Sequence, residues 1–304
     1  MGRPVLRLED GKLLRGGGRF IDDIELPGLL HACFVRSPVA HARLTGVDKD
    51  KARALPGVRA VLTYRELRPH LTCDRVPLAL PVPAVRFHVD PHYLAHDELC
   101  YVGEPMALAV AESRAIAEDA ASQIALTYDL LPAVVDPRDG LKPGAPKARL
   151  DCPDNLVAHW VVAYGDVEGA FARAAHRVAQ TFRMNKGGGH SIEARGVVAR
   201  FDRLENLLTV WDSTQMPHKA KRVLVDALGL TESEVRVIAP DVGGGFGPKP
   251  PPTSGAITRT SFSVRPSAST STRLALCGIW VESQTVSKSS IGSKRAMTPR
   301  ASIA

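Results

Sequence analysis

The residues best suited to chemistry form a glycine-rich run, DVGGGFGPK, at positions 241–249. Its glycines at 243, 244, 245 and 247 surround Phe246, directly after an expected strand over 235–239. Glycine tolerates positive φ and lets the backbone approach a ligand closely, and successive exposed N–H groups can hold an anion. Pro248 breaks both common nucleotide-binding patterns, GxxxxGK and GxGxxG. Taken alone, such a run is more often a structural turn than a cofactor cradle.

A second candidate is the segment WDSTQMPH at 211–218, between an expected strand and the start of a helix. Such a junction exposes side chains and backbone N–H groups together. Gln215 can both donate and accept hydrogen bonds there. The alternative is a helix-capping turn in which Ser213 or Thr214 is the cap. The segment by itself leaves both interpretations open.

Three histidines spaced four apart, His88, His92 and His96, would line up as metal ligands on a helix. Pro91 breaks that helix, so we interpret the segment as a polar loop. The neighbours Asp22 and Asp23 would point to opposite faces of a strand, which excludes a paired-carboxylate site. Five isolated histidines are interpreted as surface or hydrogen-bonded core residues; they are His31, His41, His159, His176 and His190.

Five cysteines are scattered and none forms a C-x-x-C pair, which argues against an iron–sulfur or structural zinc site built by this chain alone. No apolar run approaches the roughly 20 residues of a membrane span, and the N-terminus lacks the apolar stretch of a secretory signal. A cytoplasmic protein is therefore expected.

The net charge of +7 invites a nucleic-acid partner, but its distribution argues against one. Residues 250–304 hold seven of the 39 Lys and Arg and one of the 32 Asp and Glu. The first 249 residues therefore carry 32 basic and 31 acidic side chains and are nearly neutral. We expect no nucleic acid.

The order of strand and helix patterns predicts an α+β (mixed α/β) chain in four parts. Residues 1–131 form a first domain, 132–153 a proline-rich linker and 154–249 a second domain. In the second domain a hairpin is expected over 196–212 and a helix from Pro217 to Gly229. The part 250–304 is rich in Ser and Thr without periodicity, and it is expected to be disordered apart from a short element near 274–281.

Together, WDSTQMPH and VRVIAPDVGGGFGPK resemble the first cofactor-binding region of the large subunits of the xanthine dehydrogenase/aldehyde oxidase family of molybdenum hydroxylases. Upstream, GGGRFIDDIELPGLLHACFVRSPVAHARL and YVGEPMALAVAESRAIAEDAA are similar to that family's a/b hammerhead domain. The similarity covers nearly all of 10–249 in the same order and is nearest to the bacterial branch that contains carbon monoxide dehydrogenase. The fold it implies is an N-terminal hammerhead-type domain followed by an incomplete molybdopterin-binding domain.

The resemblance also implies roles. Gln215 matches the glutamine that hydrogen-bonds an oxo ligand of molybdenum. The residues that match the loop beside the metal and its dithiolene are Gly244, Gly245, Phe246 and Gly247. Glu193 and Arg195 match a charged E-x-R-G segment, interpreted as structural, in which Ala194 replaces the family's proline. No catalytic residue and no protein ligand to the metal is assigned with this match.

The activity implied is that of an oxidoreductase that hydroxylates aldehydes or N-heterocycles or oxidises carbon monoxide. Its cofactor would be molybdopterin, in the cytosine dinucleotide form, with molybdenum. Its partners would be a flavin-binding and an iron–sulfur subunit, assembled as a homodimer of heterotrimers. Residues 250–304 do not resemble the family's long continuation, so we expect a truncated or frame-shifted chain that is inactive alone and does not hold the cofactor stably. The alternative is a non-catalytic fragment or docking domain.

Overall fold

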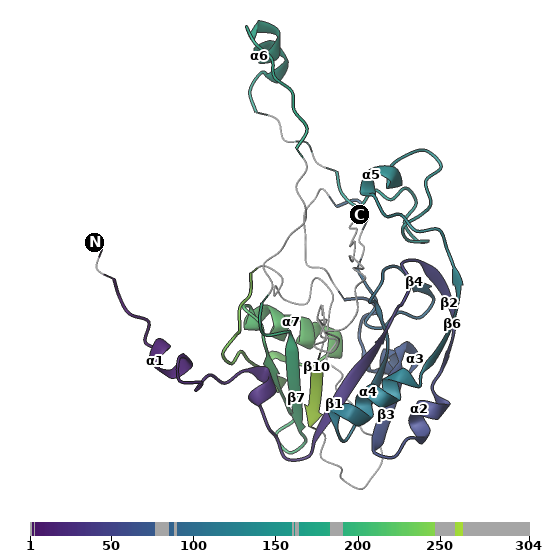
Figure 1. Ribbon diagram of the computed structural model, residues 1–304, viewed down its shortest axis with the longest axis vertical. Helices are drawn as coiled ribbons and strands as arrows, with labels where there is room; N and C mark the ends of the chain where they lie inside the picture. The colour runs from purple at the N-terminus through teal and green to yellow at the C-terminus, as the bar shows by residue number, and fades with distance from the viewer. Residues whose placement is uncertain are drawn as a thin grey trace, which may run out of the picture.

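A computed structural model describes residues 2, 4–76, 85–87, 90–159, 161, 164–182, 191–246 and 259–263 (Figure 1). It confirms the mixed α/β class. The strands lie in two sheets, and the helices are short. Within the described residues, no helix has the length and apolarity that a membrane span requires.

The main sheet has seven strands and contains both halves of the chain. Its pairs are antiparallel except for β10 with β7 and β8 with β9, which run parallel. In spatial order the strands are β3 (Val58–Thr63), β5 (Pro105–Ala111), β1 (Leu29–Arg36), β10 (Arg259–Ser263), β7 (Gly196–Asp202), β8 (Leu207–Asp212) and β9 (Val235–Ile238).

A smaller sheet accompanies the N-terminal half and consists of β4 (Glu98–Leu99), β2 (Ala42–Asp48) and β6 (Ala125–Leu130). Helix α4 (Arg114–Ser122) buries Ala117 and Ala120, and it contacts β1 and β5 of the main sheet. Ser113 caps this helix, because its Oγ atom accepts the N–H of Ile116 at 3.3 Å. The other short helices of this half are α1 (Asp10–Leu13), η1 (Ile21–Asp23), α2 (Asp50–Ala54), α3 (Tyr64–Leu67) and η2 (Arg68–His70).

The C-terminal half contains a strand–helix–strand unit that matches the sequence prediction. Helix α7 (Pro217–Leu228) begins with a proline, whose missing N–H costs nothing there, and ends at Gly229 with φ of 64°. Its apolar face is buried, and a 3-10 turn, η3 (Glu232–Glu234), leads from it into β9. The predicted hairpin is confirmed as β7 and β8, with Asn206 at φ of 50° in the turn.

The proline-rich segment between the halves contains only the four-residue helix α5 (Pro137–Gly140), as its prolines predict. Beyond it, helix α6 (Val167–Arg173) lies on a segment that projects far from the sheets (Figure 1). Asp166 caps α6, accepting the N–H of Gly169 at 2.9 Å. The helix ends at Arg173, because the backbone is already extended at Ala174.

One hydrophobic cluster joins the two halves. Leu67, Leu108 and Val110 from the first half pack in the same buried cluster as Val197 and Leu208 from the second. The two predicted domains therefore share a core, and the boundary proposed within 132–153 stays a prediction.

The expectation of disorder over 250–304 is wrong for Arg259–Ser263, which form β10 between β1 and β7. A strand between two neighbours satisfies its backbone groups on both edges, so it needs no long apolar run of its own. The element expected near 274–281 lies outside the described residues.

The shared core generates a stability prediction. Leu208 is 1% exposed, whereas Leu204, in the adjacent turn, is 99% exposed. Leu208→Ala should lower the free energy of unfolding by about 2–5 kcal/mol because it leaves a cavity in this core. Leu204→Ala should change it by less than about 0.5 kcal/mol. Chemical denaturation of both variants checks this, and equal losses would contradict the shared core.

A buried carboxyl group in the turn before β5 makes stability depend on pH. Glu104 is 4% exposed, and its carboxylate accepts the backbone N–H of Cys100 at 2.6 Å. Burial outweighs this hydrogen bond and raises the pKa of Glu104 to about 7. The folded state therefore binds the Glu104 proton more tightly than the unfolded state, in which this carboxyl group has its ordinary pKa of 4.5. The stabilisation of the fold by this bound proton is complete below the pKa that Glu104 has in the unfolded state. It is lost as pH rises through the pKa of Glu104 in the folded state.

Glu104→Gln should remove this pH dependence. Between about pH 5 and pH 8, the unfolding free energy of the variant should gain roughly 1–3 kcal/mol relative to the wild type. Denaturation at a series of pH values measures the difference. Glu118→Gln, at an exposed position on α4, is the matched control and should follow the wild-type profile.

Candidate functional site

The topology of the main sheet brings three distant segments to one edge. Strands β8 and β9 are parallel and connected through α7, so the residues after both strands lie at the same edge. Strand β7 is antiparallel to β8, with Val197 opposite Asp212, so the residues before β7 lie there too. The edge therefore collects Gln215, the glycine loop over 241–246, and Glu193.

Gln215 and the glycine loop are in direct contact. A β-carbon on Gly245 would overlap the side-chain amide of Gln215, so only glycine leaves room for that amide. Gln215 is exposed, and its amide makes no hydrogen bond to any described residue. The two motifs that the sequence separates by 30 positions are thus one structural unit.

The residues just before Gln215 hold the turn. Ser213 is buried and is linked to the start of β7, donating its N–H to the carbonyl of Gly196 at 3.2 Å. Oγ1 of Thr214 accepts the N–H of Met216 at 3.1 Å. The helix cap expected at Ser213 or Thr214 is wrong, because the N-cap of α7 is Met216 and no side chain caps the helix. Ser213 and Thr214 instead support the turn that precedes Gln215.

The loop itself has unusual backbone geometry. Gly244 has φ of 97°, and Phe246 has φ of 47°, which few residues other than glycine adopt. The Phe246 ring packs over Gly244, where a β-carbon would lie 2.6 Å from its Cε2 atom, and Phe246 remains 67% exposed. Gly247 and Lys249, also assigned to this loop, lie outside the described residues.

Glu193 fixes the loop in place. Its Oε2 atom accepts the N–H of Gly243 at 2.7 Å, and its own N–H donates to the Gly243 carbonyl at 3.3 Å. A β-carbon on Gly243 would overlap that of Glu193. Arg195, two residues on, is 7% exposed. These contacts agree with the interpretation of the E-x-R-G segment as structural.

A second anchor was missed by sequence reasoning. Asp241, at the start of the loop, forms an ion pair with Lys12 at 2.8 Å. Its carboxylate also accepts the N–H of Arg19 at 2.8 Å, and its own N–H donates to the Arg19 carbonyl at 3.0 Å. Nothing in the local pattern at either end indicates a contact across more than two hundred residues.

Among the residues discounted from the sequence, His41 behaves as expected, whereas Asp22 and Asp23 lie in the 3-10 helix η1 and not on the expected strand. His41 is a hydrogen-bonded core residue, with Nε2 at 2.8 Å from Oε1 of Glu98 and Nδ1 at 2.7 Å from the Pro132 carbonyl. Asp22 lies 3.6 Å from Arg114, whereas Asp23 accepts the N–H of Phe20, so the two carboxylates do not share a site.

Two family models match the chain. Residues 15–132 match the aldehyde oxidase and xanthine dehydrogenase a/b hammerhead domain, and residues 149–264 match the molybdopterin cofactor-binding domain. The chain belongs to the xanthine dehydrogenase/aldehyde oxidase family. The loop and Gln215 lie within the region that matches the cofactor-binding domain.

Relatives in this family are similar over most of the chain. It is 41% identical over 249 residues to the nicotine 6-hydroxylase large subunit of Paenarthrobacter nicotinovorans, covering 82% of this chain and 30% of that subunit. It is 36% identical over 256 residues to the carbon monoxide dehydrogenase large chain of Hydrogenophaga pseudoflava, covering 79% of this chain and 31% of the relative.

Solved structures are also similar to this chain in fold. Quinoline 2-oxidoreductase from Pseudomonas putida 86 superposes with a TM-score of 0.72 at 36% identity, covering 81% of this chain and 31% of that one. The chain thus spans about 30% of the length of the family members it matches.

The donor set at the sheet edge fits a molybdopterin cofactor. The Gln215 amide is exposed and offers both donors and an acceptor. The Phe246 side chain is also exposed, whereas the β-carbon positions of Gly244 and Gly245 are filled by Phe246 and Gln215.

Three glycine substitutions test the close contacts. At Gly245, an alanine meets the flexible end of Gln215, so the cost in unfolding free energy should stay below about 1 kcal/mol while the amide moves. At Gly243, it meets Cβ and the backbone of Glu193, so the cost should reach about 1–3 kcal/mol. Gly46→Ala, with ordinary contacts of 3.6 Å to Thr127, is the control.

Thermal denaturation gives the stability order, and the side-chain amide signal of Gln215 in a nitrogen–proton NMR spectrum reports its displacement. An unchanged Gln215 signal in Gly245→Ala would contradict the packing described.

Proposed function

We propose that this chain supplies part of the molybdenum cofactor site of an oxidoreductase that hydroxylates aldehydes or N-heterocycles or oxidises carbon monoxide. The observation that carries the proposal is the contact between Gln215 and Gly245 at one edge of the sheet, within the region that matches the cofactor-binding domain. Relatives named nicotine 6-hydroxylase and carbon monoxide dehydrogenase support this range of substrates.

The bound cofactor would supply the redox chemistry, and the protein would orient it. The Gln215 amide would donate a hydrogen bond to the cofactor. The exposed side chain of Phe246 would pack against it, and Gly244 and Gly245 would leave room for the Phe246 ring and the Gln215 amide. Glu193 would act as a positioning residue, because its carboxylate holds the loop through Gly243. The cytosine dinucleotide form of molybdopterin is part of the proposal, on the resemblance to the carbon monoxide dehydrogenase branch.

Partner subunits complete the proposal. The cysteines that the structure describes are Cys33, Cys73, Cys100 and Cys152, all free, and none of them belongs to a C-x-x-C pair. An electron pathway would therefore be provided by separate iron–sulfur and flavin subunits, assembled as a homodimer of heterotrimers in the cytoplasm. Relatives named as a large chain and as a complex subunit gamma support a multi-subunit enzyme.

Molybdenum content tests whether this chain suffices alone. Gln215 and the loop contact a ligand from one side only, and a functional site must be held within about 0.5 Å. The purified chain should therefore contain far less than one molybdenum atom per molecule. Elemental analysis measures this, and near-stoichiometric metal would overturn the proposal that the chain contributes only part of the site.

The proposed role itself is tested in the complex purified from the source cells. If the chain contributes to the site, molybdenum should co-purify with it together with flavin and iron–sulfur absorbance. Gln215→Ala should lower the molybdenum content or the turnover of an aldehyde or N-heterocycle about tenfold or more. His218 is a nearby exposed residue, and His218→Ala should leave both the molybdenum content and the turnover unchanged. Loss of neither quantity in Gln215→Ala would contradict the role given to this residue.

One observation favours the alternative of a docking domain. The segment that carries α6 projects away from the sheets (Figure 1), and it exposes large apolar side chains. They are Val161, Tyr164, Phe171, Val178 and Phe182, which are 57–94% exposed. If docking is the only role, replacing Phe171 and Phe182 with serine should abolish assembly with the partner subunits. Gln215→Ala should then have no effect on any activity.

A further inference from the structure

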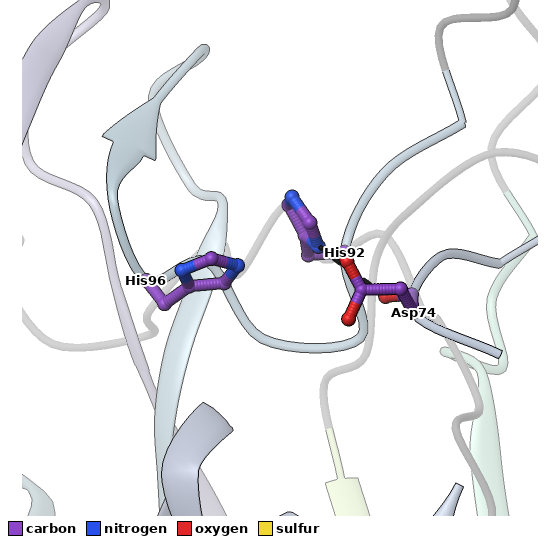
Figure 2. A group of neighbouring side chains, drawn as sticks. All are labelled: Asp74, His92 and His96. Carbon is purple, nitrogen blue, oxygen red and sulfur yellow. Dashed lines mark hydrogen bonds and ion pairs between the residues drawn. The ribbon is translucent and has the colours of Figure 1, made fainter. Parts of the chain in front are cut away.

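A second cluster of ligand-type side chains lies far from the glycine loop in sequence, in the N-terminal half. Asp74, His92 and His96 each offer one ligand atom, and these atoms lie within 4.8 Å of one another (Figure 2). We propose that these three residues bind a divalent transition-metal cation of the zinc class. This site is independent of the proposed cofactor site.

The backbone brings the three residues together without a helix. Arg75 and His92 form an isolated antiparallel bridge, which places Asp74 beside His92. His96 follows in the same loop, just before β4. The interpretation of 88–96 as a polar loop holds for the described part of it, but a loop is sufficient to gather ligands. Asp74 was not predicted as a ligand, because it does not stand at a regular spacing from the histidines in the sequence.

The state of the His96 ring points to a ligand. Its Nε2 atom is buried and has no hydrogen-bond partner among the described residues. A buried polar atom without a partner is rare in folded proteins. Its Nδ1 atom lies 2.9 Å from a carboxylate oxygen of Asp97, so the ring proton belongs on Nδ1 and Nε2 presents a lone pair. A carboxylate behind a histidine in this way is the usual support of a metal-binding imidazole.

The other two residues are held beside this lone pair, and Figure 2 shows one ring nitrogen of His96 turned toward them. Nδ1 of His92 lies 3.2 Å from the carbonyl of Asp74 and 3.6 Å from its Oδ2 atom. The His92 and His96 rings are 4.4 Å apart between centroids, edge to face. Two imidazoles and a carboxylate form a ligand set that suits Zn²⁺ and leaves a position for water.

Tyr64 and Arg68 fix the surroundings of the cluster. The Tyr64 ring stacks on His96 at 3.8 Å between centroids, and its hydroxyl donates to Oδ1 of Asp74. Arg68 lies 3.0 Å from the same oxygen, which leaves Oδ2 for a cation. Ligand atoms around one zinc ion lie about 3.3 Å apart, so binding would draw the side chains together by about 1 Å. The Arg68 guanidinium competes for the carboxylate, so we expect moderate rather than very tight affinity.

The test is metal titration of the full chain, made without a histidine tag and stripped of metal with a chelator. Isothermal titration with Zn²⁺ should show one saturable site, and Co²⁺ should give the visible absorption of a bound ion. His96→Gln and Asp74→Asn should each weaken zinc binding about tenfold or more. His218→Gln, an exposed histidine on α7, should bind as the wild type does, and so should Gln215→Ala.

A measurement on the wild type keeps the test decisive if a variant fails to fold. Zinc should shift the ring nitrogen NMR signal of His96 and should raise the melting temperature in proportion to the logarithm of zinc concentration. Absence of saturable binding at micromolar zinc, unchanged affinity in His96→Gln, or an unshifted His96 signal would each overturn the proposal. In that case the cluster is aromatic packing around Tyr64.

Discussion

Parallel pairing of β8 with β9 is the constraint on which the candidate cofactor site depends. Because the two strands run in the same direction, α7 must carry the chain back along the sheet between them. The segments that follow both strands then emerge at one edge. Gln215 and Gly245 touch for this reason, although neither residue type would create the contact alone. A single sheet topology thus turns two weak sequence patterns into one structural unit.

The glycines of the loop serve that unit in different ways. Gly243 and Gly245 are required by what lies against them, Glu193 in one case and Gln215 in the other. Gly244 is required by its own backbone, at φ of 97°. This loop has little freedom to change shape, because neighbouring side chains already fill the space around its glycines. Rigidity of this kind is what the orientation of a large cofactor demands.

Sequence reasoning recovered the elements with strong local signals. The helix between Pro217 and Gly229 and the hairpin of β7 and β8 both rest on nearby residues. It failed where distant residues decide the outcome. Strand β10 takes its hydrogen bonds from β1 and β7, which its Ser- and Thr-rich sequence does not reveal. Asp74 joins His92 and His96 only through the bridge at Arg75, and spacing along the chain cannot show that.

The contact of Asp241 with Arg19 has a consequence for the order of events during synthesis. The two residues are 222 positions apart, and Asp241 makes its hydrogen bonds to the Arg19 backbone only when both ends of that stretch exist. Closing so long a loop lowers the entropy of the chain. Contacts between residues that are close in sequence do not carry this cost. A nascent chain can therefore complete β1 to β6 on the ribosome while the glycine loop still lacks its anchor. The glycine loop therefore becomes fixed late in synthesis, after the strands of the first half have formed.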